Sequence, residues 1–152
     1  MAGGALKIED FTLTITFETH VRASLEETFA AILDQIGPKN EKPDGQPLPM
    51  KVEAWPGGRW YRDLGEGKGH YWATVQAIKR PTLLEFCGPL FASYPLVSNV
   101  QYRLSEVKGG TLITFRHTAL GFIREEDKKG VAEGWTWMMK RIREGAEGSR
   151  QH

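Results

Sequence analysis

The last long amphipathic stretch of the chain, residues 125–146, constrains its fold most. Apolar side chains recur there at the i, i+4, i+7 and i+8 spacing that places them on one side of a helix. Acidic residues at the start of the stretch and basic residues near its end suit the two ends of a helix dipole. A stripe this wide needs an apolar surface larger than one helix to cover it. Its members are Val131, Trp135, Met138, Met139, Ile142 and Ala146.

Most of the preceding chain has the pattern of β-strands. Apolar and polar residues alternate over residues 11–22, which predicts a half-buried strand. Ser24 and Glu27 then have the spacing of a capping box, which predicts a helix that ends at Gly37 and Pro38. After Pro49, short apolar runs separated by glycine and proline predict about six more strands. The order of these predicted strands and helices favours an α+β fold, in which a curved antiparallel sheet of about six to seven strands wraps around a long C-terminal helix.

The bulk composition indicates one domain of ordinary charge. A chain of 152 residues is long enough for one core, here expected at about 11–145, with residues 1–10 and 146–152 flexible. The formal net charge of +1 gives no basic footprint for nucleic acid, and no apolar run reaches the length of a membrane span. A single cysteine and the lack of a signal-peptide pattern lead us to expect a cytoplasmic location.

Residues 37–49 separate the first helix from the later strands. They contain four prolines and two glycines and predict a loop. Two interpretations are open for a loop of this length. It is either a lid over a site or a tolerated insertion.

Alternation along the strands predicts which side chains face the helix. On this basis Trp72 points outward and its neighbour Tyr71 points inward. Two interpretations of the inward set are open: a fully packed core, or the lining of a cavity for an apolar ligand. The predicted ligand-binding residues are Phe17, Trp60, Tyr71, Phe86, Val100, Tyr102, Phe115, His117, Trp135, Met138 and Met139.

His117 is the one candidate for catalysis, because histidine titrates near neutral pH and this residue ends an otherwise apolar inward face. The alternative is a histidine whose ring is satisfied by a backbone carbonyl at the sheet edge. The four histidines and Cys87 show no metal-ligand spacing, so we expect no metal site. No nucleophile motif or phosphate loop occurs, and no cofactor is expected.

Several motifs, taken together, resemble those of the START-like SRPBCC superfamily, in the group related to the chaperone (heat-shock) ATPase activator domain. Trp55-Pro-Gly-Gly-Arg-Trp60 is similar to its "pGGrf" turn, and Pro81-Thr-Leu-Leu-Glu-Phe86 to its "P-x-x-L-x-F" strand. The resemblance covers about residues 11–144 and implies a helix-grip (START/Bet v-like) fold that encloses an apolar pocket. It departs from the group after the first helix, where this chain has a proline-rich loop in place of a tryptophan-rich turn. The remaining matching segments are Val21–Phe29, Thr111–His117, Gly121 and Gly134-Trp135.

Three functions are compatible with these observations. The first is a domain that binds a small apolar or aromatic molecule. The second is an enzyme of the polyketide cyclase or dehydratase type that uses the same cavity. The third is a chaperone-activator-like interaction or stress-response module, although such activators add an N-terminal domain that we do not expect here. Trp72 and Trp137, if exposed, would mark a self-association surface and a homodimer.

Overall fold

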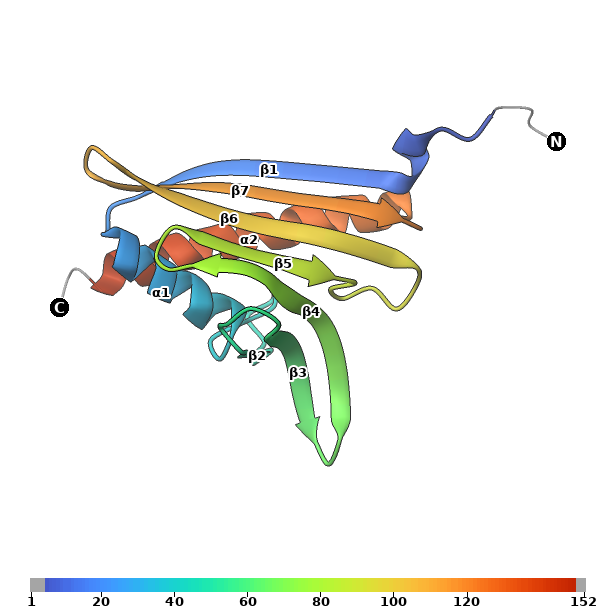
Figure 1. The fold of residues 1–152 in the computed structure, drawn as a ribbon, viewed down its shortest axis with the longest axis horizontal. Helices are drawn as coiled ribbons and strands as arrows, with labels where there is room; N and C mark the ends of the chain where they lie inside the picture. The colour runs from blue at the N-terminus through green and yellow to red at the C-terminus, as the bar shows by residue number, and fades with distance from the viewer. Residues whose placement is uncertain (1–4, 150–152) are drawn as a thin grey trace.

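The computed structural model describes residues 5–149, which form one curved sheet and two α-helices (Figure 1). The strands are β1 (Thr12–Val21), β2 (Lys51–Val52), β3 (Arg59–Gly65), β4 (Lys68–Lys79), β5 (Leu83–Gly88), β6 (Leu96–Val107) and β7 (Gly110–Gly121). The helices are α1 (Leu25–Ile36), α2 (Glu125–Ser149) and a short 3-10 helix, η1 (Ile8–Phe11). Helix α2 therefore continues beyond residue 146, and the expectation of flexibility at 1–4 and 150–152 lies outside the described residues.

All seven strands pair antiparallel in the order β1-β7-β6-β5-β4-β3-β2. Helices α1 and α2 lie against the same concave face of this sheet, and the β3–β4 hairpin bends away from them as an arm (Figure 1). The predicted helix-grip architecture is confirmed. No helix among residues 5–149 is long and apolar enough to cross a membrane.

The start of α1 follows from its capping residues. Ser24 Oγ accepts a hydrogen bond from the backbone N–H of Glu27, and Glu27 Oε1 accepts one from the N–H of Ser24, both at 3.0 Å. These bonds satisfy two backbone donors that the first helical turn leaves free. The predicted capping box is confirmed.

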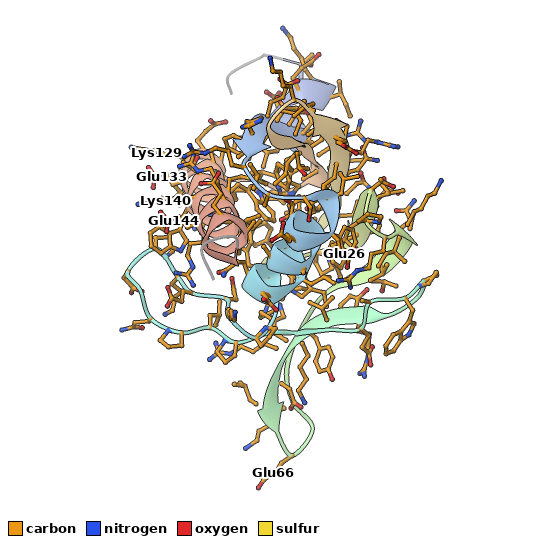
Figure 2. All side chains as sticks on the ribbon, turned by 90° about the vertical axis from the view of Figure 1, so that its left-hand side faces the viewer. Glu26, Glu66, Lys129, Glu133, Lys140 and Glu144 are labelled. Atoms are coloured by element: carbon orange, nitrogen blue, oxygen red, sulfur yellow. The ribbon has the colours of Figure 1, made fainter. Side chains whose placement is uncertain are left out.

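The core lies between the concave face of the sheet and the two helices. The predicted alternation is confirmed on β6 and β7, where Val100, Tyr102, Ile113 and Phe115 have no exposed surface. Charged side chains take the opposite side of α2. Figure 2 shows Lys129, Glu133, Lys140 and Glu144 on its outer surface and Glu66 at the tip of the β3–β4 arm.

Strand β4 departs from simple alternation. Trp60 pairs with Ala73, but the next residue, Tyr61, pairs with Tyr71, so Trp72 is the extra residue of a β-bulge. The prediction for Tyr71 and Trp72 was therefore wrong: Tyr71 is 44% exposed, whereas Trp72 packs against the core. A bulge reverses the side of every residue beyond it, and a sequence pattern gives no sign of the reversal.

Candidate functional site

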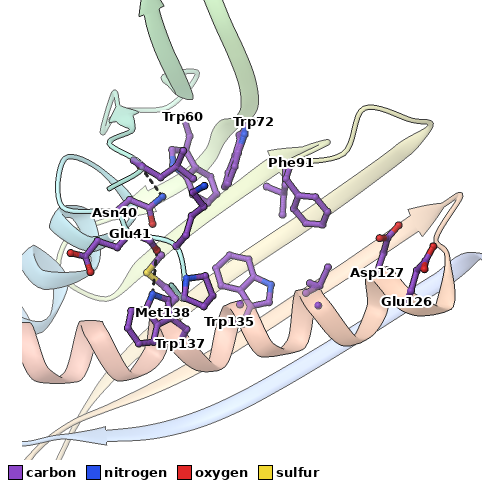
Figure 3. Close-up of a pocket in the computed structure, with 17 residues that line it drawn as sticks. Asn40, Glu41, Trp60, Trp72, Phe91, Glu126, Asp127, Trp135, Trp137 and Met138 are labelled. Atoms are coloured by element: carbon purple, nitrogen blue, oxygen red, sulfur yellow. Dashed lines mark hydrogen bonds between the residues drawn. The ribbon is translucent and has the colours of Figure 1, made fainter. Parts of the chain in front are cut away.

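A pocket of about 320 Å³ lies between α2, the loop of residues 37–49 and the sheet (Figure 3). We call it the α2 pocket. This volume is at the small end of the range for sites that bind organic molecules. Its exposed rim is formed by Lys42, Pro43, Phe91 and Glu126.

The wall of the α2 pocket is mainly apolar, and aromatic rings reach it from α2, from the sheet and from the connection after β5. Helix α2 contributes Glu126, Asp127, Gly130, Val131, Gly134, Trp135, Trp137 and Met138. The sheet and the connection after β5 contribute Trp60, Trp72, Leu90 and Phe91, and the loop contributes Asn40, Glu41, Lys42, Pro43 and Leu48.

Two glycines of α2 leave the pocket open. Gly130 and Gly134 are four residues apart, so they share one side of the helix. Both line the pocket, and a Cβ atom added to either would meet no heavy atom within 4 Å. Glycine in a helix interior costs about 1 kcal/mol relative to alanine. Helix α2 therefore carries a stability cost at the two positions where side chains would fill the pocket.

The loop of residues 37–49 is fixed to α2 by polar contacts. Trp137 Nε1 donates a hydrogen bond to the Glu41 carbonyl oxygen at 3.2 Å. The Arg141 guanidinium lies 2.9 Å from the Glu41 carboxylate and donates to Gln35 Oε1 at 3.0 Å. Because these contacts come from α1, α2 and the loop itself, the loop forms an ordered side wall of the pocket.

The connection after β5 is fixed to the start of α2. Tyr94 Oη donates a hydrogen bond to Asp127 Oδ2 at 3.1 Å, and Arg124 Nε donates to the same oxygen at 3.0 Å. The Arg124 guanidinium holds the pKa of the Asp127 carboxyl below its usual range. Burial, and then the Asp127 carboxylate, raise the pKa of the Tyr94 phenol. Asp127 is therefore an ionised acceptor that anchors the pocket mouth.

The predicted site residues fall into three groups. Trp60, Trp135 and Met138 line the α2 pocket. A second group lies in the packed core beneath it: Phe17, Phe86, Val100, Tyr102, Phe115, His117 and Met139. Tyr71 belongs to neither group. It lines a separate surface depression on the β3–β4 arm, where its hydroxyl bonds Thr74 Oγ1.

His117 is 1% exposed, and both of its ring nitrogens have side-chain partners. Trp135 Nε1 donates to His117 Nδ1 at 2.9 Å, so Nδ1 carries no proton and Nε2 donates to Ser98 Oγ at 2.9 Å. Burial lowers the pKa of His117 to about 4. The ring is thus neutral at pH 7 and joins the sheet to α2. Its partners are side chains rather than the backbone carbonyl that the alternative interpretation invoked.

Tyr102 on β6 differs from His117, because its buried hydroxyl has no hydrogen-bond partner among residues 5–149. Its ring packs on Phe115 with the two centroids 5.0 Å apart. We expect Tyr102→Phe to raise the free energy of unfolding by about 1 kcal/mol, because it removes a desolvated polar group and keeps the ring. Urea denaturation measures the change. A loss of stability would show that the hydroxyl has a partner, such as a buried water.

Several pocket residues lie outside the predicted set. Trp72 and Trp137, predicted to be exposed for self-association, line the pocket instead, so the predicted homodimer has no support from them. Trp137 follows Gly130 and Gly134 on the same helical side, a spacing that the sequence does contain. Asn40 and Phe91 come from connections whose course the sequence does not specify.

The part of the chain that the structure describes holds no group of three or more His, Cys, Asp or Glu side chains placed to bind a metal ion. The polar groups at the pocket are the buried amide of Asn40, the Lys42 ammonium on the rim, indole N–H groups, and carboxylates paired with arginines.

One family model and several solved structures match this chain. The family model described as "Activator of Hsp90 ATPase homolog 1-like protein" matches residues 22–147. Similar solved structures include protein MLL2253 from Mesorhizobium loti, with 17% identity, a TM-score of 0.63 and coverage of 87% of this chain and 95% of that chain. Another is Ara h 8.0201, with 17% identity, a TM-score of 0.64 and coverage of 89% of this chain and 97% of that chain.

The di-domain ARO/CYC StfQ from the steffimycin biosynthetic pathway has 9% identity and a TM-score of 0.70, covering 95% of this chain and 54% of that chain. At these identities the solved structures show a shared fold alone. No curated protein sequence matched the chain.

Proposed function

Because the chain belongs to the family of Activator of Hsp90 ATPase homolog 1-like proteins, as its motifs predicted, we propose that it uses the helix-grip fold to bind a small apolar or aromatic molecule in the α2 pocket. The observation that carries this proposal is the pocket against Gly130 and Gly134, two lining positions of α2 that put no side chain into it. Aromatic side chains surround that space, and the helix gives up stability at both glycines.

The chemistry of the wall supports an apolar ligand. An organic molecule is held mainly by the apolar surface that it removes from water, at about 25 cal/mol per Å². Indole and phenyl rings also offer faces and edges for stacking, as Trp72 already stacks edge to face on Trp60 at 5.1 Å. A flat ring system therefore fits the wall better than a highly polar molecule.

An enzyme of the cyclase or dehydratase type has less support. It needs a proton donor or acceptor on the pocket wall. The carboxylates there are each paired with an arginine at 2.9 to 3.1 Å, and His117 lies in the core with both nitrogens engaged. The pairs are Glu41–Arg141, Glu126–Arg124 and Asp127–Arg124.

Filling the pocket from the helix tests the binding proposal. Gly134→Leu is expected to weaken the binding of the fluorescent probe N-phenyl-1-naphthylamine by about tenfold or more, because the new side chain occupies the space of the ligand. Fluorescence titration measures the affinity. Leucine is also a better helix former than glycine, so the variant keeps its fold.

Gly148→Leu is the matched control. Gly148 lies in the same helix, also meets no atom within 4 Å of an added Cβ, and is remote from the pocket wall. It is expected to bind the probe as the wild type does. Equal affinities of Gly134→Leu and the wild type, or no probe binding by any of the three proteins, would overturn the proposal.

A further inference from the structure

Asn40 is the buried polar side chain of the α2 pocket, and its amide is oriented by the backbone around it. The residue is 5% exposed and lines the pocket. Its Nδ2 donates a hydrogen bond to the Leu48 carbonyl oxygen at 3.0 Å. A carbonyl only accepts, so this bond fixes which end of the amide is nitrogen and turns Oδ1 the other way.

The backbone of Asn40 is held as firmly as its side chain. Its N–H donates to the Gly37 carbonyl at 3.1 Å, and its own carbonyl accepts from the Leu48 N–H at 2.8 Å. Three hydrogen bonds therefore set the position of the amide. In Figure 3 the Asn40 oxygen points toward the α2 side of the pocket.

Asn40 Oδ1 accepts no hydrogen bond from residues 5–149. Three of the donors on the pocket wall are already used, whereas Trp72 Nε1 and Lys42 Nζ have no hydrogen-bond or ion-pair partner among residues 5–149. Three indole N–H groups on the pocket wall donate to protein acceptors, at distances of 2.9 to 3.2 Å. These bonds are Trp60 Nε1 to the Ile36 carbonyl, Trp135 Nε1 to His117 Nδ1 and Trp137 Nε1 to the Glu41 carbonyl. The pocket thus keeps one oriented amide oxygen that no protein donor reaches.

From this oriented acceptor we propose that the α2 pocket selects planar aromatic molecules that carry a hydrogen-bond donor, a hydroxyl or an N–H, which donates to Asn40 Oδ1. The inference rests on the proposed binding function and names the ligand class. A ligand carboxylate at this position would face an acceptor with no proton between them, so the group that meets Asn40 Oδ1 must be a hydroxyl or an N–H.

Two ligand pairs isolate the hydrogen bond. 2-Naphthol and indole each carry one donor, and 2-methoxynaphthalene and 1-methylindole are the same rings with the donor blocked. Isothermal titration calorimetry on the full chain is expected to give about three- to tenfold tighter binding for the donor-bearing member of each pair. This ratio should be similar for both pairs, since they share only the donor.

One variant of Asn40 assigns the ratio to that residue. Asn40→Ala removes both the Oδ1 acceptor and the bond to the Leu48 carbonyl. Loss of the bond is expected to weaken the binding of all four ligands. Loss of the acceptor is expected to bring the affinity ratio within each ligand pair close to one.

A ratio that is the same in the wild type and in Asn40→Ala would overturn this inference and leave the binding function in place, provided that Gly134→Leu still blocks the ligands. A wild type that binds neither member of either pair would overturn both.

Discussion

Replacing Phe115 with alanine is expected to lower the free energy of unfolding by about 4 kcal/mol. The ring has no exposed surface, and its centroid lies 4.7 Å from that of Trp135, 5.0 Å from that of Tyr102 and 6.0 Å from that of Phe17. Truncation removes the buried area of the ring and leaves a void that three rigid rings cannot close. Guanidinium denaturation of the two proteins measures the difference.

The matched control is Phe122→Ala. Phe122 is 65% exposed just beyond β7, so the same truncation is expected to change stability by less than about 0.5 kcal/mol. A loss below about 1 kcal/mol at Phe115 would mean that the concave face is loosely filled there. Phe115 would then line a cavity, as the inward alternation allowed, rather than the packed core beneath the pocket.

Acidification from pH 7 to pH 4 is expected to remove about 3 kcal/mol of stability through His117 alone. In the unfolded chain the ring takes up a proton near its ordinary pKa of about 6.5, whereas burial lowers its pKa in the folded protein to about 4. The unfolded state therefore binds more protons between these values. Stability is fully present above about pH 6.5 and is lost as the pH falls toward 4.

The contacts of His117 explain why the folded protein resists this proton. Protonation would add a hydrogen to Nδ1, which would then face the N–H of Trp135 with no acceptor between them. The hydrogen bond from Trp135 on α2 to His117 on the sheet would break. The free energy of unfolding measured at intervals between pH 7 and pH 4.5 gives the slope. His117→Gln is expected to flatten it, and His20→Gln, on an exposed position of β1, is the matched control. An unchanged slope in His117→Gln would contradict the assignment.

The sequence predicted the fold well because the strongest patterns belong to regular elements. Strands β6 and β7 alternate without interruption, and Val100, Tyr102, Ile113 and Phe115 are buried as predicted. The site was predicted less completely, and the α2 pocket contains three of the eleven predicted residues. Alternation identifies the side chains that face inward, but it does not say which of them touch a void.

The residues missed at the site have specific physical causes. Trp72 points inward only because it is the extra residue of a bulge. Asn40 and Phe91 lie in connections, whose positions depend on tertiary contacts such as those of Arg141 with the loop and of Tyr94 with Asp127. The glycines at 130 and 134 did carry a signal, since two glycines on one side of a helix indicate an unfilled or closely approached surface.

The position of β1 has a consequence for how the chain reaches this structure. β1 is an edge strand, and its one partner in the sheet is β7, with Thr12 opposite Leu120 and Val21 opposite Thr111. β1 therefore cannot pair in the sheet until β7 has been made. Strands β2 to β6 and helix α1 all lie in the loop that this pairing closes. Folds with such distant pairings form slowly, because chain entropy is lost before the contacts are gained. During synthesis the edges of β1 and β6 that pair with β7 stay open until β7 has been made, and the pocket is completed only after the part of α2 that lines it has followed.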